Sequence, residues 1–170
     1  MSFSFLPKII VDSVTQLPAQ LLKDRNIRLL MLDFDNTIVP YTTSVPTDDM
    51  VKWLKDMADS GIQLCVVSNS KKDRVKIFCE EYGLDCITHA RKPFRDGIGK
   101  CLERYQVEPS QAAIAGDQIY TDTLGGNCAG VTTVLVRAIH NHTIWLKLRH
   151  VAELPFIFFA RKRRYRNEKS

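Results

Sequence analysis

Short apolar segments alternate along the chain with segments whose apolar residues recur every three or four positions. Five apolar segments predict β-strands: 28–32, 63–67, 86–88, 112–115 and 132–136. Several of these runs are continuously apolar, which is typical of strands that are covered on both faces. Strands that alternate with helical segments predict an α/β fold, with a mostly parallel five-stranded sheet between layers of helices.

The predicted helices between these strands have recognisable ends. Thr47 can cap a helix whose first turn carries Asp48 and Asp49, because carboxylates suit the positive end of the helix dipole. Gly61 would end this helix, since glycine readily adopts the left-handed conformation that follows a helix. Further helices are expected in three segments: about 71–82, about 95–105 and about 122–130.

A chain of 170 residues suits one domain, and we expect a core with two flanking segments. Residues 28–140 should form the α/β core. Residues 1–27 should pack on this core or flank it, with a turn and one helix in residues 6–23. Residues 141–170 combine an amphipathic helical stretch, interrupted at Pro155, with a basic tail.

Composition argues against several classes of protein. No apolar run approaches the roughly 18 residues that a membrane-spanning helix needs. The N-terminus lacks the basic start and long apolar stretch of a signal peptide, so we expect a cytoplasmic protein. The five cysteines are scattered and the four histidines are poorly spaced for zinc, which favours free thiols over a disulfide framework or a zinc site.

The net charge of +5 is unevenly distributed. Residues 137–170 hold nine Lys and Arg against two Glu, a balance of +7, whereas residues 1–136 hold fifteen against seventeen, a balance of −2. The basic tail could therefore contact an anionic membrane or a nucleic acid.

The first candidate for chemistry is the segment Asp33-Phe34-Asp35-Asn36-Thr37, which directly follows the first predicted strand. Two carboxylates at the end of an apolar strand have no packing function, and they repel each other unless a cation lies beside them. Mg²⁺ would supply that charge, because it is a hard cation that prefers carboxylate oxygen. An acidic turn without any ligand is the alternative interpretation.

Three further segments follow the ends of later strands. Ser68 and Asn69 precede a helix, where a hydroxyl and an amide can hold phosphate oxygens. Lys92 follows the third strand, and its cation could neutralise a transferring phosphoryl group. Asp117 and Asp122 follow the fourth strand, where a second metal ligand could reach the first pair. A helix cap, a solvated lysine and an acidic loop are the separate alternatives. The carboxyl ends of strands share one sheet edge in such folds, so we expect these segments to meet there.

Taken in order, these motifs resemble the haloacid dehalogenase-like phosphatase superfamily over about residues 28–136. The resemblance implies a three-layer Rossmann-like fold with strand order 5-4-1-2-3 and Mg²⁺ as cofactor. The segment around Asp33, residues 6–23 and residues 145–149 further resemble subfamily IIIA, which includes the phosphatidylglycerophosphate phosphatases of phospholipid biosynthesis.

The resemblance also implies a role for each matching residue. Asp33 would be the nucleophile, which forms an aspartyl-phosphate, and a metal ligand. Asp35 would be the acid and base, with its backbone carbonyl on the metal. The remaining residues would bind phosphate (Ser68, Asn69), bridge nucleophile and phosphate (Lys92) or complete the metal site (Asp117). Thr37 would be a supporting residue, and Asp122 would support the metal site or the lysine.

The short spacing between the motifs leaves no room for a cap domain. Only 32 residues lie between Asp35 and Ser68, and 23 between Ser68 and Lys92, and helices that cover the sheet account for both intervals. An open site favours a phosphate carried on something large, and our leading hypothesis is hydrolysis of phosphatidylglycerophosphate to phosphatidylglycerol.

Two other hypotheses stay open. The substrate could be a soluble phosphoester, such as a nucleotide, a sugar phosphate or a phosphoprotein. The chain could instead be a nucleic-acid-binding or ribosome-associated module, although a nucleic acid is the weaker candidate because the tail has a single aromatic residue, Tyr165. Phe156, Phe158 and Phe159 beside the basic tail could place the enzyme peripherally on the inner face of a membrane. The alternative is that both termini pack on the domain and the tail is solvated.

Overall fold

The computed structural model describes residues 4–71 and 73–139. In this part of the chain, six strands form one parallel sheet in the order β1-β6-β5-β2-β3-β4. The strands are β1 (Ile9–Val11), β2 (Leu29–Leu32), β3 (Gln63–Val67), β4 (Asp85–Ile87), β5 (Ala112–Gly116) and β6 (Thr132–Val136). The five expected strands are therefore present in the expected order, with β2 in the middle of the sheet.

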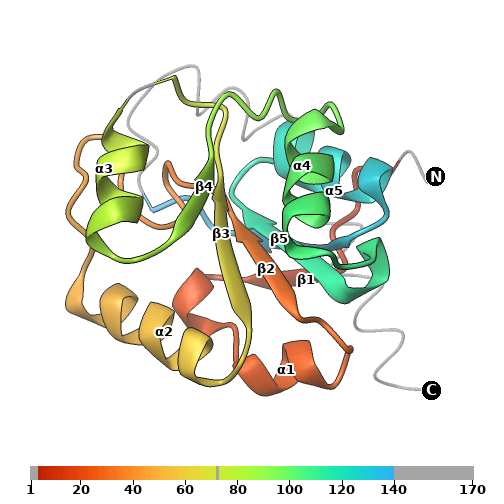
Figure 1. Cartoon of the computed structure of the whole chain (residues 1–170), viewed down its shortest axis with the longest axis horizontal. Coiled ribbons are helices and arrows are strands. Elements are labelled where there is room, and N and C mark those ends of the chain that lie inside the picture. The colour runs from red at the N-terminus through yellow and green to blue at the C-terminus, as the bar shows by residue number, and fades with distance from the viewer. Residues whose placement is uncertain (1–3, 72, 140–170) are drawn as a thin grey trace.

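Helices cover both faces of this sheet (Figure 1). The α-helices are α1 (Ala19–Lys23), α2 (Asp48–Asp59), α3 (Arg74–Glu81), α4 (Asp96–Tyr105) and α5 (Leu124–Ala129). Single turns of helix are η1 (Val14–Gln16), η2 (Pro109–Gln111) and the π-helical η3 (Ile119–Thr123).

Side chains alternate between two apolar cores, one on each face of the sheet. Leu30 and Val66 pack in the core that α2 and α3 cover, whereas Met31, Cys65 and Ile114 pack in the core that α4 and α5 cover. Strands β2, β5 and β6 are buried on both faces, as their continuous apolar runs predicted.

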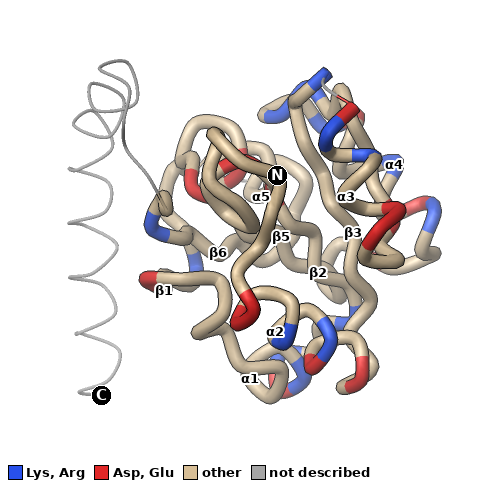
Figure 2. The backbone as a smooth tube through the Cα atoms, turned by 90° about the vertical axis from the view of Figure 1, so that its left-hand side faces the viewer, with Lys and Arg blue, Asp and Glu red and all other residues tan. Residues whose placement is uncertain are grey.

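The structure adds a sixth strand to the five expected ones, because residues 9–11 form β1, whereas α1 confirms the helix expected within residues 6–23. β1 lies at the sheet edge and pairs with β6, with Ile9 opposite Val134 and Val11 opposite Val136 (Figure 2). A strand of three residues has almost no periodicity of its own. Its partner lies about 125 positions further along the chain, so local pattern cannot reveal it.

The helix boundaries follow their expected caps closely. The Thr47 hydroxyl accepts a hydrogen bond from Met50 N at 3.3 Å, and Gly61 adopts a φ of 88° after α2. α3 begins at Arg74, three residues later than expected, because Ser68 to Lys71 remain in a loop. In the described residues, α2 is the only α-helix between β2 and β3, and α3 the only one between β3 and β4. Within this described part of the chain, no cap domain is inserted at either place.

None of the helices within residues 4–71 and 73–139 has both the length and the apolar character that crossing a membrane requires. The expected amphipathic helix and basic tail of residues 141–170 lie outside the described residues.

Candidate active site

Asp33 is the first residue after β2, and the sheet itself holds its backbone. Asp33 N donates to Ala115 O at 2.8 Å, which extends the pairing of β2 with β5 by one residue. The side chain of Asp33 is only 8% exposed. A carboxylate is thus buried at the carboxyl edge of the central strand, where ligands bind in open α/β sheets.

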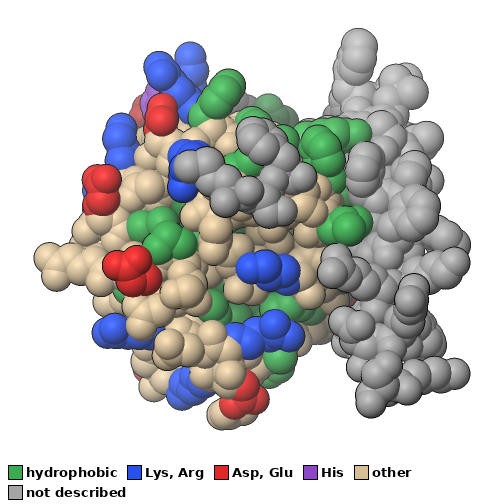
Figure 3. Space-filling model, turned by 90° about the vertical axis from the view of Figure 1, so that its right-hand side faces the viewer, with side chains coloured by type: hydrophobic (Ala, Val, Ile, Leu, Met, Phe, Trp, Pro, Cys, Tyr) green, Lys and Arg blue, Asp and Glu red, His purple; other side chains and the backbone are tan. Residues whose placement is uncertain are grey.

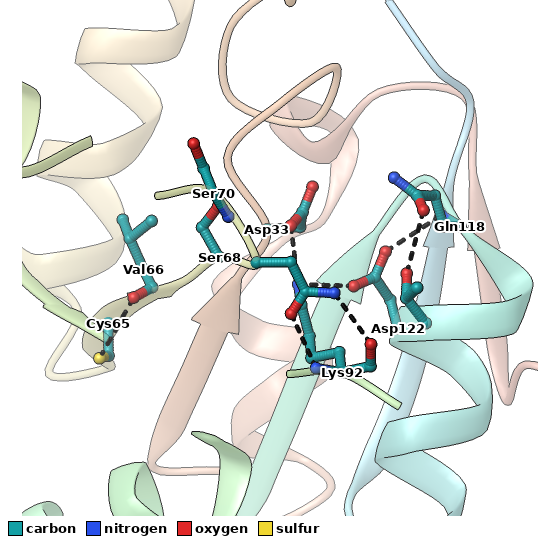
Figure 4. Close-up of polar contacts among 10 residues, drawn as sticks. Asp33, Cys65, Val66, Ser68, Ser70, Lys92, Gln118 and Asp122 are labelled. Carbon is teal, nitrogen blue, oxygen red and sulfur yellow. Dashed lines mark hydrogen bonds and ion pairs between the residues drawn. The ribbon is translucent and has the colours of Figure 1, made fainter. Parts of the chain in front are cut away.

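Lys92 lies between two of the buried carboxylates. Its Nζ is 2.7 Å from Asp33 Oδ1 and 2.7 Å from Asp122 Oδ1, and its side chain is 1% exposed (Figure 4). Burial alone would lower the pKa of Lys92, but the charges of Asp122 and Asp33 outweigh it and raise the pKa above its usual value. The lysine is therefore a permanent cation inside the site.

The loop that carries Lys92 is held by the loop that follows β3. Asn69 Nδ2 donates to Lys92 O at 2.9 Å, and Asn69 Oδ1 accepts from Lys92 N at 2.7 Å. Ser68 is buried, its backbone carbonyl accepts from Ala90 N, and its hydroxyl accepts from Ser70 N at 3.1 Å. Two predicted phosphate-binding residues thus also position the predicted cation.

Asp117 and Asp122 reach the same place from the segment that follows β5. Oxygen atoms of Asp33, Asp117 and Asp122 all lie within 4.8 Å of one another, and all three residues are buried. Gln118 N donates to Asp122 Oδ2 at 3.1 Å, within the π-helical turn. Gly116 makes this approach feasible, because a Cβ at this position would overlap the Asp122 carboxylate.

These residues fit a divalent cation. Three carboxylates and one ammonium give the cluster a formal charge of −2, from −3 and +1. Asp33 Oδ2 is buried and has no hydrogen-bond partner among the described residues. In the absence of a metal ion, burial raises the pKa of Asp33 to about 7. The charge of Lys92 opposes this rise, and the charge of Asp122 adds to it. Oxygen ligands of this kind suit Mg²⁺.

Asp35 pairs with a residue that the sequence analysis did not single out. Arg74, the first residue of α3, places an NH2 atom 3.0 Å from Asp35 Oδ1, and both side chains are largely buried. In the sequence, Arg74 is one of several basic residues after β3, so only its burial distinguishes it. Thr37 is buried as well, and its hydroxyl has no hydrogen-bond partner among the described residues.

A known protein family matches most of the chain. The profile of a family described as mitochondrial PGP phosphatase matches residues 2–139. A bacterial relative, "Probable phosphatase YqeG" of Bacillus subtilis (strain 168), is 34% identical over 132 residues. The aligned part covers 78% of this chain and 77% of that relative.

Solved structures share the fold. One is the cobalt-bound form of the deoxy-D-mannose-octulosonate 8-phosphate phosphatase of Haemophilus influenzae, with a TM-score of 0.53 and 15% identity, covering 74% of this chain and 75% of that one. Another is a hydrolase of the HAD superfamily, subfamily III A, from Legionella pneumophila, with a TM-score of 0.54 and 15% identity over 71% of each chain.

The likeness to solved structures establishes only the fold, because the sequence identity is 15% in both cases. The match over residues 2–139 and the bacterial relative go further. The chain is a phosphatase that belongs to the mitochondrial PGP phosphatase family, and it shares the fold of solved hydrolases of the haloacid dehalogenase superfamily.

Proposed function

We propose that this phosphatase hydrolyses phosphatidylglycerophosphate to phosphatidylglycerol and phosphate, through an aspartyl-phosphate on Asp33 and with Mg²⁺ as cofactor. The substrate class comes from the family description. The observation that carries the mechanism is the buried contact of Lys92 with both Asp33 and Asp122. It provides a carboxylate and a fixed cation in the same water-poor place, as phosphoryl transfer requires.

The metal would be held by the carboxylates of Asp33 and Asp117 and by the backbone carbonyl of Asp35, with Asp122 in support. When bound, Mg²⁺ would neutralise the repulsion between a carboxylate and a phosphate dianion. The formal charge of −2 on the cluster supports a divalent ion over a monovalent one.

Asp33 Oδ2 is the atom best suited to attack phosphorus, since Lys92 already binds Oδ1. As the new O–P bond forms, the bond from phosphorus to the glycerol oxygen breaks, and Asp35 gives its proton to that oxygen. Asp35 then takes a proton from water, which attacks phosphorus, breaks the bond to Asp33 and releases phosphate. Both residues return to their starting states.

The phosphoryl oxygens would be bound by Ser68, Asn69 and Lys92. The Ser68 hydroxyl accepts from Ser70 N, so its own hydrogen can donate to a phosphoryl oxygen. Asn69 uses one N–H on Lys92 O and keeps a second for the substrate. Lys92 would balance charge that builds up during transfer.

A lipid substrate is supported by the loop that carries Lys92. Phe94 is 69% exposed on this loop, and Arg91 and Arg95 are exposed beside it in the sequence. At the top of the molecule, Figure 3 shows a hydrophobic side chain close to basic ones, with an acidic side chain and a histidine among them. An aromatic ring between cations suits the interface of an anionic bilayer. The enzyme would then act as a peripheral membrane protein, without a cap domain between site and lipid.

The test is phosphate release from micellar phosphatidylglycerophosphate, with and without Mg²⁺. We expect turnover that excess chelator abolishes and that Asp33→Asn abolishes together with the acid-stable, hydroxylamine-labile phosphoenzyme. Turnover of soluble phosphoesters alone would overturn the lipid substrate. Full activity in chelator would overturn the metal, and an active Asp33→Asn variant would overturn the nucleophile.

A further inference from the structure

We propose that Arg74 is a positioning residue, which holds Asp35 in the orientation needed to pass a proton to and from the leaving oxygen. This inference rests on the proposed function, because it assigns Asp35 as the acid and base. It starts from the ion pair between Arg74 NH2 and Asp35 Oδ1, at 3.0 Å, with side-chain exposures of 17% and 20%. A pair this far removed from water is ordered far better than a surface ion pair.

The rest of the guanidinium binds the loop that follows Asp35. Arg74 NH1 donates to Tyr41 O at 2.6 Å, and NH2 donates to Thr43 O at 2.8 Å. The same side chain therefore fixes the carboxylate and the backbone a few residues beyond it. Movement of the loop away from α3 would break all of these contacts together.

Ring contacts determine where the guanidinium plane lies. Arg74 Cζ is 5.0 Å from the centroid of the Phe34 ring, and Phe34 is the buried residue between Asp33 and Asp35. Phe34 packs edge to face on Phe78 of α3, with centroids 5.2 Å apart. A planar group with donors on separate nitrogen atoms can stack on a ring while it binds three acceptors, whereas the ammonium of lysine has all three donors on one atom and no planar face.

The position of Arg74 is unfavourable for the helix itself. A cation at the first residue of α3 opposes the positive end of the helix dipole, and α3 has no acidic residue in its first turn. Helix stability therefore does not explain an arginine here. Its contacts with Asp35 and with the loop do.

The geometry defines which oxygen of Asp35 can carry a proton. Since Oδ1 accepts an N–H from Arg74, a proton on this carboxyl group belongs on Oδ2. Loss of Arg74 would remove this contact, and the orientation of the carboxyl group, and with it the direction of the transferred proton, would be less well fixed. Misplacement of about 1 Å can cost about 10²-fold in rate.

The experiment compares substrates that differ in their need for an acid. p-Nitrophenyl phosphate has a good leaving group and needs little protonation, whereas glycerol phosphate needs it strongly. We expect Arg74→Met to lower kcat for glycerol phosphate by about 10²-fold, with a much smaller loss for p-nitrophenyl phosphate and little change in KM. Arg74→Lys should retain part of the activity, and added guanidinium should partly rescue Arg74→Ala. The exposed Lys76 on the same helix provides a control, and Lys76→Met should match the wild type.

The decisive comparison is made in the Asp35→Asn background. If Arg74 acts through Asp35, Arg74→Met should add almost nothing to the loss that Asp35→Asn causes. Equal losses on both substrates, or full additivity with Asp35→Asn, would overturn the inference and leave Arg74 a purely structural residue. Neither result touches the proposed function, which has its own tests: phosphate release from micellar phosphatidylglycerophosphate, its loss in excess chelator and its loss in Asp33→Asn.

Discussion

The side-chain amide of Asn69 makes two hydrogen bonds with the backbone of Lys92. Asn69 Nδ2 donates to Lys92 O at 2.9 Å, and Asn69 Oδ1 accepts from Lys92 N at 2.7 Å. One residue at the end of β3 thereby determines where the lysine backbone lies, and so how far the ammonium reaches toward Asp33. The phosphate-binding loop and the cation-bearing loop therefore behave as a single unit.

The first prediction concerns this amide. Asn69→Asp keeps the acceptor for Lys92 N but places a carboxylate oxygen against Lys92 O, so we expect kcat to fall by roughly 10–10²-fold. Steady-state kinetics with p-nitrophenyl phosphate measures the effect. Asn26→Asp is a matched control, because Asn26 is exposed and outside the site. Equal kinetics for the two variants would show that the amide does not position Lys92.

The second prediction concerns the charge of Lys92. Lys92→Met leaves Asp33 and Asp122 buried without their cation, so we expect a loss of about 3–5 kcal/mol in the free energy of unfolding in chelator. Activity should also disappear. Urea denaturation measures the loss, and Lys100→Met, at an exposed position on α4, should change it little. An unaltered urea midpoint in Lys92→Met would contradict the buried ion pairs.

The third prediction separates two glycines. Gly116→Ala should displace the Asp122 carboxylate and weaken both turnover and stability, because the added Cβ has no space. Gly99→Ala has open space around it inside α4, so it should stabilise the protein by about 0.5–1 kcal/mol and leave turnover unchanged. Thermal unfolding and phosphate release measure both. A fully active Gly116→Ala variant would argue against the importance of the Asp122 position.

The fourth prediction uses metal removal. In chelator the carboxylates of the cluster repel one another, so Asp117→Asn should raise the melting temperature. With Mg²⁺ at about 100 times its Kd, the wild type should gain about 2.7 kcal/mol in stability, and Asp117→Asn should gain much less. Calorimetry with and without Mg²⁺ measures both effects of Asp117→Asn: the higher melting temperature in chelator and the smaller gain in stability with Mg²⁺. A variant that loses stability in chelator and still responds fully to Mg²⁺ would exclude Asp117 from the metal site.

The fifth prediction concerns the exposed ring of Phe94. Phe94→Ser should lower turnover of phosphatidylglycerophosphate in vesicles of phosphatidylcholine and phosphatidylglycerol, because it removes apolar contact with the bilayer. Turnover of p-nitrophenyl phosphate should stay the same. Ile77→Ser is the matched control, since Ile77 is 61% exposed but lies on α3 rather than on the Lys92 loop. Equal vesicle turnover for both variants would contradict a role for Phe94.

The meeting of Asp33 and Asp117 at one edge was predictable, because parallel strands present their carboxyl ends together and β5 lies next to β2. The contact of Lys92 with Asp122 was expected only as one of two roles that the family resemblance implied for Asp122. It depends on the π-helical turn after β5 and on the missing side chain of Gly116, and neither leaves a periodic pattern in the sequence.

Arg74 shows a second limit of sequence reasoning. The sequence places it in a run of charged residues, where a basic side chain is ordinarily solvated. Only the folded chain brings the loop of Tyr41 and Thr43 across to it. Contacts between segments more than 30 positions apart are set by tertiary packing, which local periodicity does not encode.

The pairing of β1 with β6 has a consequence for biosynthesis. Residues 9–11 are made about 125 positions before their partner strand, residues 132–136. A ribosome that adds roughly 5–20 residues per second would leave this apolar strand waiting for several seconds. Residues 9–11 are therefore a place where a chaperone has reason to bind during synthesis, and the sheet is completed only once residues 132–136 have been made.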